Sequence, residues 1–306
     1  MDKIQKQSRS LNNRLSQTFA IHTGVFLGRV LPRRIGLALT DGIGKFLGRN
    51  KTSPMVRAIR ANQWVIHDQS LSSEQLDQLP VTIFQSAARC MFDYFYFLSR
   101  PKKLQSVIEL SPEAQQAIDR IRLNQPTVIV CPHLSNFDLM GYALALNELK
   151  LQVLSFPNPG AAYRLQNKIR ERVGLKVTPM TLTAFQQARN RLRNGGSVLT
   201  GLDRPLENAQ KYRPTFFGHP CSLPVTYVRL AKEANAPVIL MAATSKPDHS
   251  YRLIGSHPIW MKSFADLETE ILFNANRVLS KAAPLIRTYA HQWAMFYPIW
   301  PQYLGV

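Results

Sequence analysis

The residues with the clearest chemical potential stand together in segment 132–140, which reads Pro-His-Leu-Ser-Asn-Phe-Asp-Leu-Met. His133 and Asp138 are five positions apart, so on one regular helix their side chains would point about 140° away from each other. They can meet if His133 lies in a turn and Asp138 in the first turn of a following helix. We therefore expect His133 to give one ring N–H to Asp138 and to keep its other nitrogen free as a general base.

The flanking residues favour this geometry. A β-branched run, Thr127–Cys131, precedes the motif and predicts a buried strand that ends at Pro132. Ser135 or Asn136 can cap the helix, which places Asp138 at the positive end of the helix dipole. The carboxyl ends of parallel strands are where α/β sheets bind ligands. Ser135-x-x-Asp138 is also a serviceable capping box, so the spacing alone leaves a purely structural interpretation open.

Predicted strands and helices alternate along the rest of the chain. Strands are expected at 127–131, 151–156, 197–201 and 238–243, and helices at 81–98, 141–149, 184–192 and 225–234. This alternation predicts an α/β fold, with a mostly parallel central sheet flanked by helices and a helical, basic N-terminal region before it. We assign residues 1–60 to a membrane-associating region and residues 61–306 to the α/β domain.

Charge and cysteine content narrow the function classes. The 306 residues include 38 Lys and Arg against 19 Asp and Glu, a net charge of +19, which predicts attraction to nucleic acid, an anionic membrane or a phosphorylated ligand. Stacking aromatics are not interleaved with the basic residues in a recognised nucleic-acid module, so we expect no nucleic-acid partner. Cys90, Cys131 and Cys221 form no Cys-x-x-Cys pair, so we expect no zinc site.

Residues 1–60 hold twelve basic and two acidic side chains, and an uncharged run of fourteen residues, Leu15 to Gly28, lies between the basic clusters. As a helix this run would span ~21 Å, less than the ~30 Å hydrocarbon core, so a membrane crossing is disfavoured. Apolar residues with basic flanks recur at helical spacing, as in a helix that lies in the membrane interface (Leu11, Leu15, Phe19, Phe26, Val30). The aromatic end, 288–306, fits either an interface or a tail folded onto the core.

The motif His133-Leu-Ser-Asn-Phe-Asp138 resembles the H-x4-D signature of the glycerolipid acyltransferase superfamily. It is most similar to the version in the late acyltransferases of lipid A biosynthesis and the mycobacterial phosphatidylinositol mannoside acyltransferases. Further segments resemble the family in type and order, namely Gly-Leu-Asp-Arg at 201–204, Phe-Phe-Gly-His-Pro at 216–220, Ala-Pro-Val at 236–238 and Gln-Trp at 292–293. Ser135 stands where the family usually has glycine, and Asp138 stands where the lipid A enzymes usually have glutamate.

The resemblance implies transfer of a fatty acyl group from a thioester, on acyl-carrier protein or coenzyme A, to a hydroxyl of a membrane lipid. It implies His133 as general base, Asp138 as its partner, no covalent enzyme intermediate, and no metal or other cofactor. The acceptor is expected to be a glycolipid or a lipid A-like molecule, with a lysophospholipid as the alternative. The enzyme is then expected on the cytoplasmic face of the inner membrane, as a peripheral or monotopic protein.

Five further residues are expected to bind substrate. Asn136 is a candidate donor to the oxyanion, and Asp203 and Arg204 follow a predicted strand, where Arg204 could bind a phosphate. Phe217 and Gly218 could line the acyl tunnel or belong to the core. A lipid or thioester hydrolase with Ser135 as nucleophile is the alternative outside the transferases, although the Gly-x-Ser-x-Gly elbow is absent.

Overall fold

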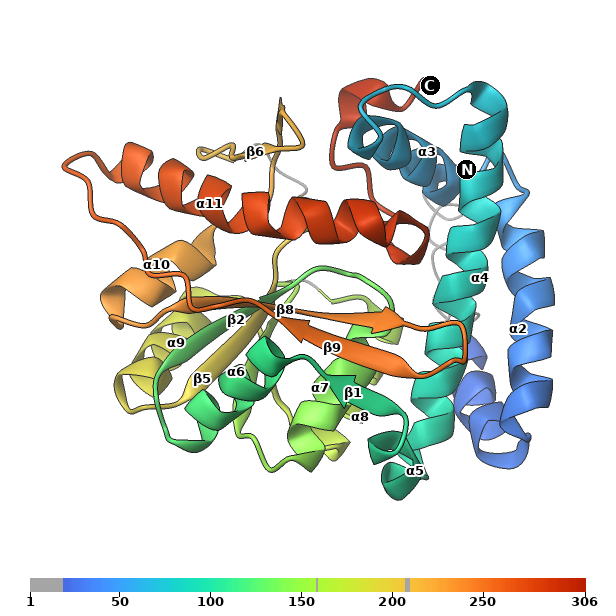
Figure 1. Ribbon diagram of the computed structural model, residues 1–306, viewed down its shortest axis with the longest axis horizontal. Helices are drawn as coiled ribbons and strands as arrows, with labels where there is room; N and C mark the ends of the chain where they lie inside the picture. Colours follow the sequence, from blue (N-terminus) through green and yellow to red (C-terminus); the bar gives the residue numbers. More distant parts are fainter. Residues whose placement is uncertain (1–18, 158, 207–209) are drawn as a thin grey trace, which may run out of the picture.

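The computed structural model describes residues 19–157, 159–206 and 210–306. Within these ranges a seven-stranded sheet, in the order β1-β9-β8-β2-β5-β3-β4, forms the centre of the molecule (Figure 1). Among the described strands of this sheet, only β8 and β9 pair in antiparallel fashion. The predicted α/β fold with a mostly parallel sheet is confirmed. The strands are β1 (Ile108–Leu110), β2 (Thr127–Cys131), β3 (Leu151–Ser155), β4 (Lys176–Pro179), β5 (Ser197–Gly201), β8 (Val238–Ser245) and β9 (Tyr251–Gly255).

Helices cover both faces of the sheet, because alternate residues of each strand point to opposite sides. Val128 and Val130 of β2 pack into one core with helices α9 to α11, whereas Ile129 and Cys131 pack into the other with α6 and α7. Figure 1 shows α11 above the sheet and α6 and α7 below it. These helices are α6 (Pro112–Arg122), α7 (Phe137–Leu146), α8 (Ala161–Arg172), α9 (Leu182–Arg193), α10 (Thr226–Glu233) and α11 (Leu267–Thr288).

The N-terminal region is helical, as predicted. Residues 19–30 form a helix, and α2 (Arg33–Gly48) follows it and packs along α4 (Ser73–Leu98), which separates α2 from the sheet (Figure 1). Small residues at every fourth position, 36, 40, 44 and 48, are the buried side of α2, so the two helix backbones approach closely. A Cβ on Gly44 would collide with the backbone of Gln85. The remaining elements here are α3 (Pro54–Ile66) and α5 (Pro101–Gln105).

Because its small side faces α4, helix α2 turns its large apolar side chains outward. Large exposed apolar residues on α2 and the helix before it are Phe19, Phe26, Val30, Ile35, Leu39, Ile43, Phe46 and Leu47. Four cations on the same two helices and their flanks are exposed as well, namely Arg29, Arg34, Lys45 and Arg49. We call this set of apolar and basic side chains the α2 face. Leu11 and Leu15 of the predicted stripe lie outside the described residues.

The aromatic C-terminal segment folds onto the core. After α11 it forms the short 3₁₀ turns η1 (Ala290–Gln292) and η2 (Pro301–Tyr303). The side chains of Trp293 and Trp300 are almost completely buried, so of the two interpretations left open above, the folded-back tail is correct for these rings. Across the described ranges, none of the helices combines the length and apolarity needed to span a membrane.

The packing of α2 on α4 gives a matched pair of substitutions. Gly44→Ala should lower the free energy of unfolding by about 1–3 kcal/mol, because its methyl group has no room against α4. Gly42 lies on the same helix, but a Cβ there meets nothing within 4 Å, so Gly42→Ala should raise stability by about 0.5–1 kcal/mol through helix propensity. Urea unfolding of both variants measures the difference. Equal effects would contradict close packing of α2 on α4.

Candidate active site

Two neighbouring strands bring His133 and Asp203 together. Strands β2 and β5 pair in parallel, with Cys131 opposite Gly201. His133 and Asp203 each come two residues after these partners, so they leave the sheet side by side at its carboxyl edge. The predicted position of His133 in the turn after β2 is therefore confirmed, and it coincides with the ligand-binding edge of a parallel sheet.

Asp203 is fully buried and accepts hydrogen bonds from three donors. One oxygen, Oδ1, lies 2.6 Å from Nδ1 of His133, and the other, Oδ2, accepts from the backbone N–H of His133 at 2.8 Å. Nε1 of Trp293 also donates to Oδ2, at 2.8 Å. These contacts fix the ring of His133 with Nδ1 toward the carboxylate. They leave Nε2 without a hydrogen-bond partner among the described residues.

The expectation that Asp138 orients His133 is wrong for this structure. Asp138 does lie in the first turn of α7, as predicted, but its carboxylate faces α8. It accepts from Nε of Arg170 and from Nε2 of Gln166, both at 2.7 Å. Burial alone would lower the pKa of the Arg170 guanidinium, but Asp138, together with Tyr163, more than offsets this and the pKa is raised. This buried ion pair joins α7 to α8.

Asn136 also differs from expectation. Its side-chain oxygen caps α7 by accepting from the N–H of Leu139 at 3.2 Å, and its amide nitrogen donates to the carbonyl of Cys90 and to the hydroxyl of Tyr251. The capping role predicted for it is confirmed. Because both sides of this buried amide are engaged within the protein, Asn136 is not available as a donor to an oxyanion.

Ser135 adopts the left-handed backbone conformation, with φ of 49°. Glycine enters this region without steric cost, whereas a side chain with Cβ is strained there. This explains why glycine would suit position 135. The turn is held from outside, because the N–H of Ser135 donates to the carbonyl of Gln292 and the carbonyl of His133 accepts from the N–H of Ala294. The C-terminal segment thus braces the turn that carries the histidine.

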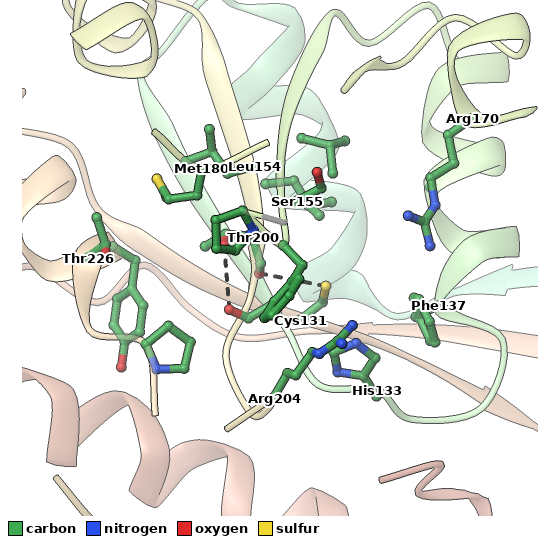
Figure 2. Close-up of a pocket in the computed structure, with 18 of the residues that line it drawn as sticks. Cys131, His133, Phe137, Leu154, Ser155, Arg170, Met180, Thr200, Arg204 and Thr226 are labelled. Carbon is green, nitrogen blue, oxygen red and sulfur yellow. Dashed lines mark hydrogen bonds between the residues drawn. The ribbon is translucent and has the colours of Figure 1, made fainter. Parts of the chain in front are cut away.

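A cavity of about 250 Å³ opens beside His133, and we call it the sheet cavity. Figure 2 shows His133 and Arg204 at one end of it and Leu154 and Met180 at the other. Apolar side chains from the strand ends and α10 make most of its remaining wall (Val153, Leu154, Leu175, Met180, Leu199, Leu206, Leu230). Burial raises the pKa of the Cys131 thiol in this wall to about 12, so at neutral pH it is protonated and a poor nucleophile.

A second cavity, of about 190 Å³, lies on the other side of His133, and we call it the helix cavity. Its own wall is formed by one side of α4, the C-terminal segment 294–297, Ser135 and Asn136 of the turn, and Gln166 of α8. The two cavities share the residues at their junction: His133, Phe137, Asp138, Tyr163, Arg170 and Arg204. His133 can therefore reach molecules in both.

Arg204 stands between the two cavities. Its guanidinium lies over the ring of Phe156, in the wall of the sheet cavity, at 4.2 Å, and over the ring of Tyr297, in the wall of the helix cavity, at 4.3 Å. No carboxylate in the described ranges pairs with it. A cation without a carboxylate partner, next to His133, is suited to bind an anionic group of a substrate. Arg204 thus lies at the carboxyl edge of the sheet, as predicted.

Phe217 and Gly218 are not brought to either cavity. They form the two-residue turn between β6 (Thr215–Phe216) and β7 (His219–Pro220), where both have positive φ, 48° and 78°. A tight hairpin with this backbone requires glycine or a tolerant residue, so the motif is explained by the turn. Phe217 packs against the ring of Trp300. Of the two roles left open for this motif, the place in the core fits Phe217, and neither residue lines the two cavities beside His133.

Sequence reasoning missed Trp293 and Arg170 as parts of the site. The Gln-Trp pair at 292–293 was visible in the sequence, but its distance from residue 133 hid the contact. Gln292 clamps the end of β8 through two hydrogen bonds with the backbone of Ser245, which sets Trp293 over Asp203. Within the described ranges, histidine, cysteine and acidic side chains form no cluster of three that could hold a metal ion.

Comparison with known families assigns the chain. A family model described as bacterial lipid A biosynthesis acyltransferase matches residues 3–302. The chain belongs to this family. The resemblance drawn from the motifs is therefore confirmed, and the protein is an acyltransferase of lipid biosynthesis. A search of curated proteins found no match to the chain.

The hydrogen bond from Trp293 to Asp203 can be tested against a second buried tryptophan of this lipid A-type acyltransferase. Trp293→Phe removes a donor to a buried carboxylate, so it should cost about 1.5–3 kcal/mol of stability and lower turnover at least tenfold, because Asp203 holds His133 less firmly. Trp300 is equally buried, but its Nε1 has no partner in the described structure. Trp300→Phe should therefore cost less stability and leave turnover close to wild type. Similar losses of turnover in both variants would show that Trp293 acts only by packing.

Proposed function

We propose that this acyltransferase moves a fatty acyl group from an acyl thioester to a hydroxyl of a glycolipid or lipid A-like acceptor, with His133 as general base. One observation carries the proposal: His133 is held through Nδ1 by buried Asp203, while its Nε2 is free at the junction of two cavities. Two substrates must meet at one base in a direct transfer. The carrier of the thioester is acyl-carrier protein or coenzyme A.

The reaction balances as a proton transfer coupled to acyl transfer. Nε2 of His133 accepts the proton of the acceptor hydroxyl while its oxygen forms a bond to the thioester carbonyl carbon. The Asp203 carboxylate stabilises the imidazolium and keeps Nδ1 protonated. When the C–S bond breaks, the imidazolium returns the proton to the leaving thiolate, and no acyl group is held by the enzyme.

The walls of the sheet cavity support it as the site of the donor's acyl chain, because most of them are apolar side chains in the interior of the fold. Arg204 at its mouth is proposed to bind a phosphate of the carrier or of the lipid headgroup. A hydrolase that uses Ser135 is less well supported, because the Oγ of this buried residue lies 3.8 Å from Sγ of Cys90 and makes no hydrogen bond with His133.

Substitutions of His133, Asp203 and Asp138 separate the roles proposed for them. His133→Ala should lower the transfer rate by at least 100-fold, because positioned general-base catalysis contributes about 10²–10⁴-fold. Asp203→Asn should be comparably impaired, because an amide no longer fixes the reactive tautomer. Asp138→Asn should lower the stability of the protein, because the buried guanidinium of Arg170 loses its carboxylate partner. The loss of rate per folded molecule should be smaller.

The measurement is release of thiol from an acyl thioester, with and without acceptor, and circular dichroism checks folding. The proposed role of Asp203 fails if Asp138→Asn, at unchanged melting temperature, is the more impaired of the two. Thiol release that needs no acceptor would instead indicate a hydrolase. Acceptors of both classes, a tetra-acylated lipid A disaccharide and a lysophospholipid, should be compared.

We also propose that the α2 face docks the enzyme on the cytoplasmic leaflet of the inner membrane as a peripheral protein. The support is its combination of outward apolar side chains with exposed cations, each of which gains ~1 kcal/mol near an anionic surface. The packing of α2 on α4 would keep this helix parallel to the molecular surface. The lipid acceptor would then lie close to the active site.

Vesicle sedimentation tests this docking surface. Replacing Ile35, Leu39, Ile43 and Phe46 by serine should weaken binding to phosphatidylglycerol-containing vesicles more than tenfold, because each apolar side chain contributes by leaving water. The control replaces three exposed leucines elsewhere, Leu123, Leu182 and Leu267, by serine and should bind as wild type does. Binding of the wild type should fall as salt rises. Equal losses in both variants would exclude the α2 face as the docking surface.

A further inference from the structure

We infer that the helix cavity binds the acceptor and that the hydroxyl of Tyr94 is a hydrogen-bond partner for it. The inference rests on the proposed function. The sheet cavity and the helix cavity meet only around His133 and its shared wall. If the donor chain fills the sheet cavity, the attacking hydroxyl must approach His133 from the helix cavity.

The wall of the helix cavity has a mixed chemistry that selects an amphipathic ligand. Apolar side chains line the part formed by α4 and the C-terminal segment, among them Ala87, Met91 and Phe296. Polar and charged groups gather where this cavity joins the other, around Arg204 and Tyr163. A sugar or glycerol phosphate without a chain would leave the apolar part of the wall in contact with water.

Tyr94 supplies an independent observation. Its side chain lines the helix cavity and is only 1% exposed, yet its hydroxyl has no hydrogen-bond partner in the described structure. Buried hydroxyls are nearly always paired, so an unpaired one in a cavity wall points to a ligand that pairs with it. Burial raises the pKa of Tyr94, and the charges of Asp138 and Arg170 act on the same hydroxyl. The group is therefore a neutral phenol close to the junction, able to donate or accept.

The position of the cavity also suits a ligand that arrives from a membrane. Helix α4 contributes one side to the helix cavity and another to the packing with α2. Met91, on the cavity side of α4, is 41% exposed and so lies at an apolar opening. This opening is where the acyl chain of a membrane lipid would enter the helix cavity.

Two matched pairs of variants test the assignment. Tyr94→Phe and Tyr227→Phe each remove a buried hydroxyl without a partner in the described structure, one in the helix cavity and one in the sheet cavity. Tyr94→Phe should raise the KM for acceptor about tenfold and leave the KM for donor unchanged, whereas Tyr227→Phe should leave the acceptor KM unchanged. Ala87→Phe, which fills the helix cavity, should also raise the acceptor KM, and Val153→Phe, which fills the sheet cavity, should shift the preference to shorter donor chains.

Two acylated acceptors serve as probes, a tetra-acylated lipid A disaccharide bisphosphate and lysophosphatidic acid. Each is compared with its counterpart without acyl chains, which is the glucosamine disaccharide bisphosphate for the first and glycerol 3-phosphate for the second. Circular dichroism reports whether each variant is folded, and the KM for donor reports whether it binds the thioester. The inference is overturned if Tyr94→Phe leaves the acceptor KM unchanged for every probe, or if Ala87→Phe alters donor chain length and Val153→Phe alters acceptor KM. Thiol release without transfer to any probe would defeat the proposed function itself, and this inference with it.

Discussion

The site depends on one buried carboxylate. Taking the charge of Asp203 out of water costs several kcal/mol, and it is offset only if donors surround the carboxylate. Here the donors are the backbone and ring of His133 and the indole of Trp293. They come from the end of β2 and from the last twenty residues of the chain, so the sheet register and the C-terminal fold must both be correct before the base is in place. The orientation of His133 and the global fold therefore depend on the same contacts.

Local patterns were sufficient to predict most of the fold and part of the site. Apolar runs, and the residues that end them, predicted the strands near His133. Pro132 and the capping residues predicted the turn after β2. The partner of the histidine could not be found in this way. Spacing within one segment favoured Asp138, but the carboxylate that binds Nδ1 comes from the neighbouring strand, seventy residues later. Which strands are neighbours depends on the packing of the whole sheet. This order cannot be predicted from the sequence of one segment.

Asp138 retains a structural part at the site. Its ion pair with Arg170 is almost completely buried on both sides, so neither charge can lose its partner without a large cost. The pair joins the start of α7 to α8 and forms wall that both cavities share. An acidic residue five positions after the histidine is thus explained without contact between the two. The Asp138–Arg170 pair helps to shape the two cavities beside His133.

A chain of buried hydrogen bonds joins the α2 face to the same motif. Arg33, at the start of α2, makes two hydrogen bonds to Asp93 of α4, at 2.8 and 2.7 Å. Asp93 also accepts from the hydroxyl of Tyr251, which in turn accepts from the amide of Asn136, the cap of α7. Asp93 is buried and Arg33 is partly exposed, so moving α2 away would leave a buried carboxylate without its cation and would destabilise the helix start that follows His133. The helix proposed to meet the membrane and the turn that carries His133 are therefore joined by one hydrogen-bond network.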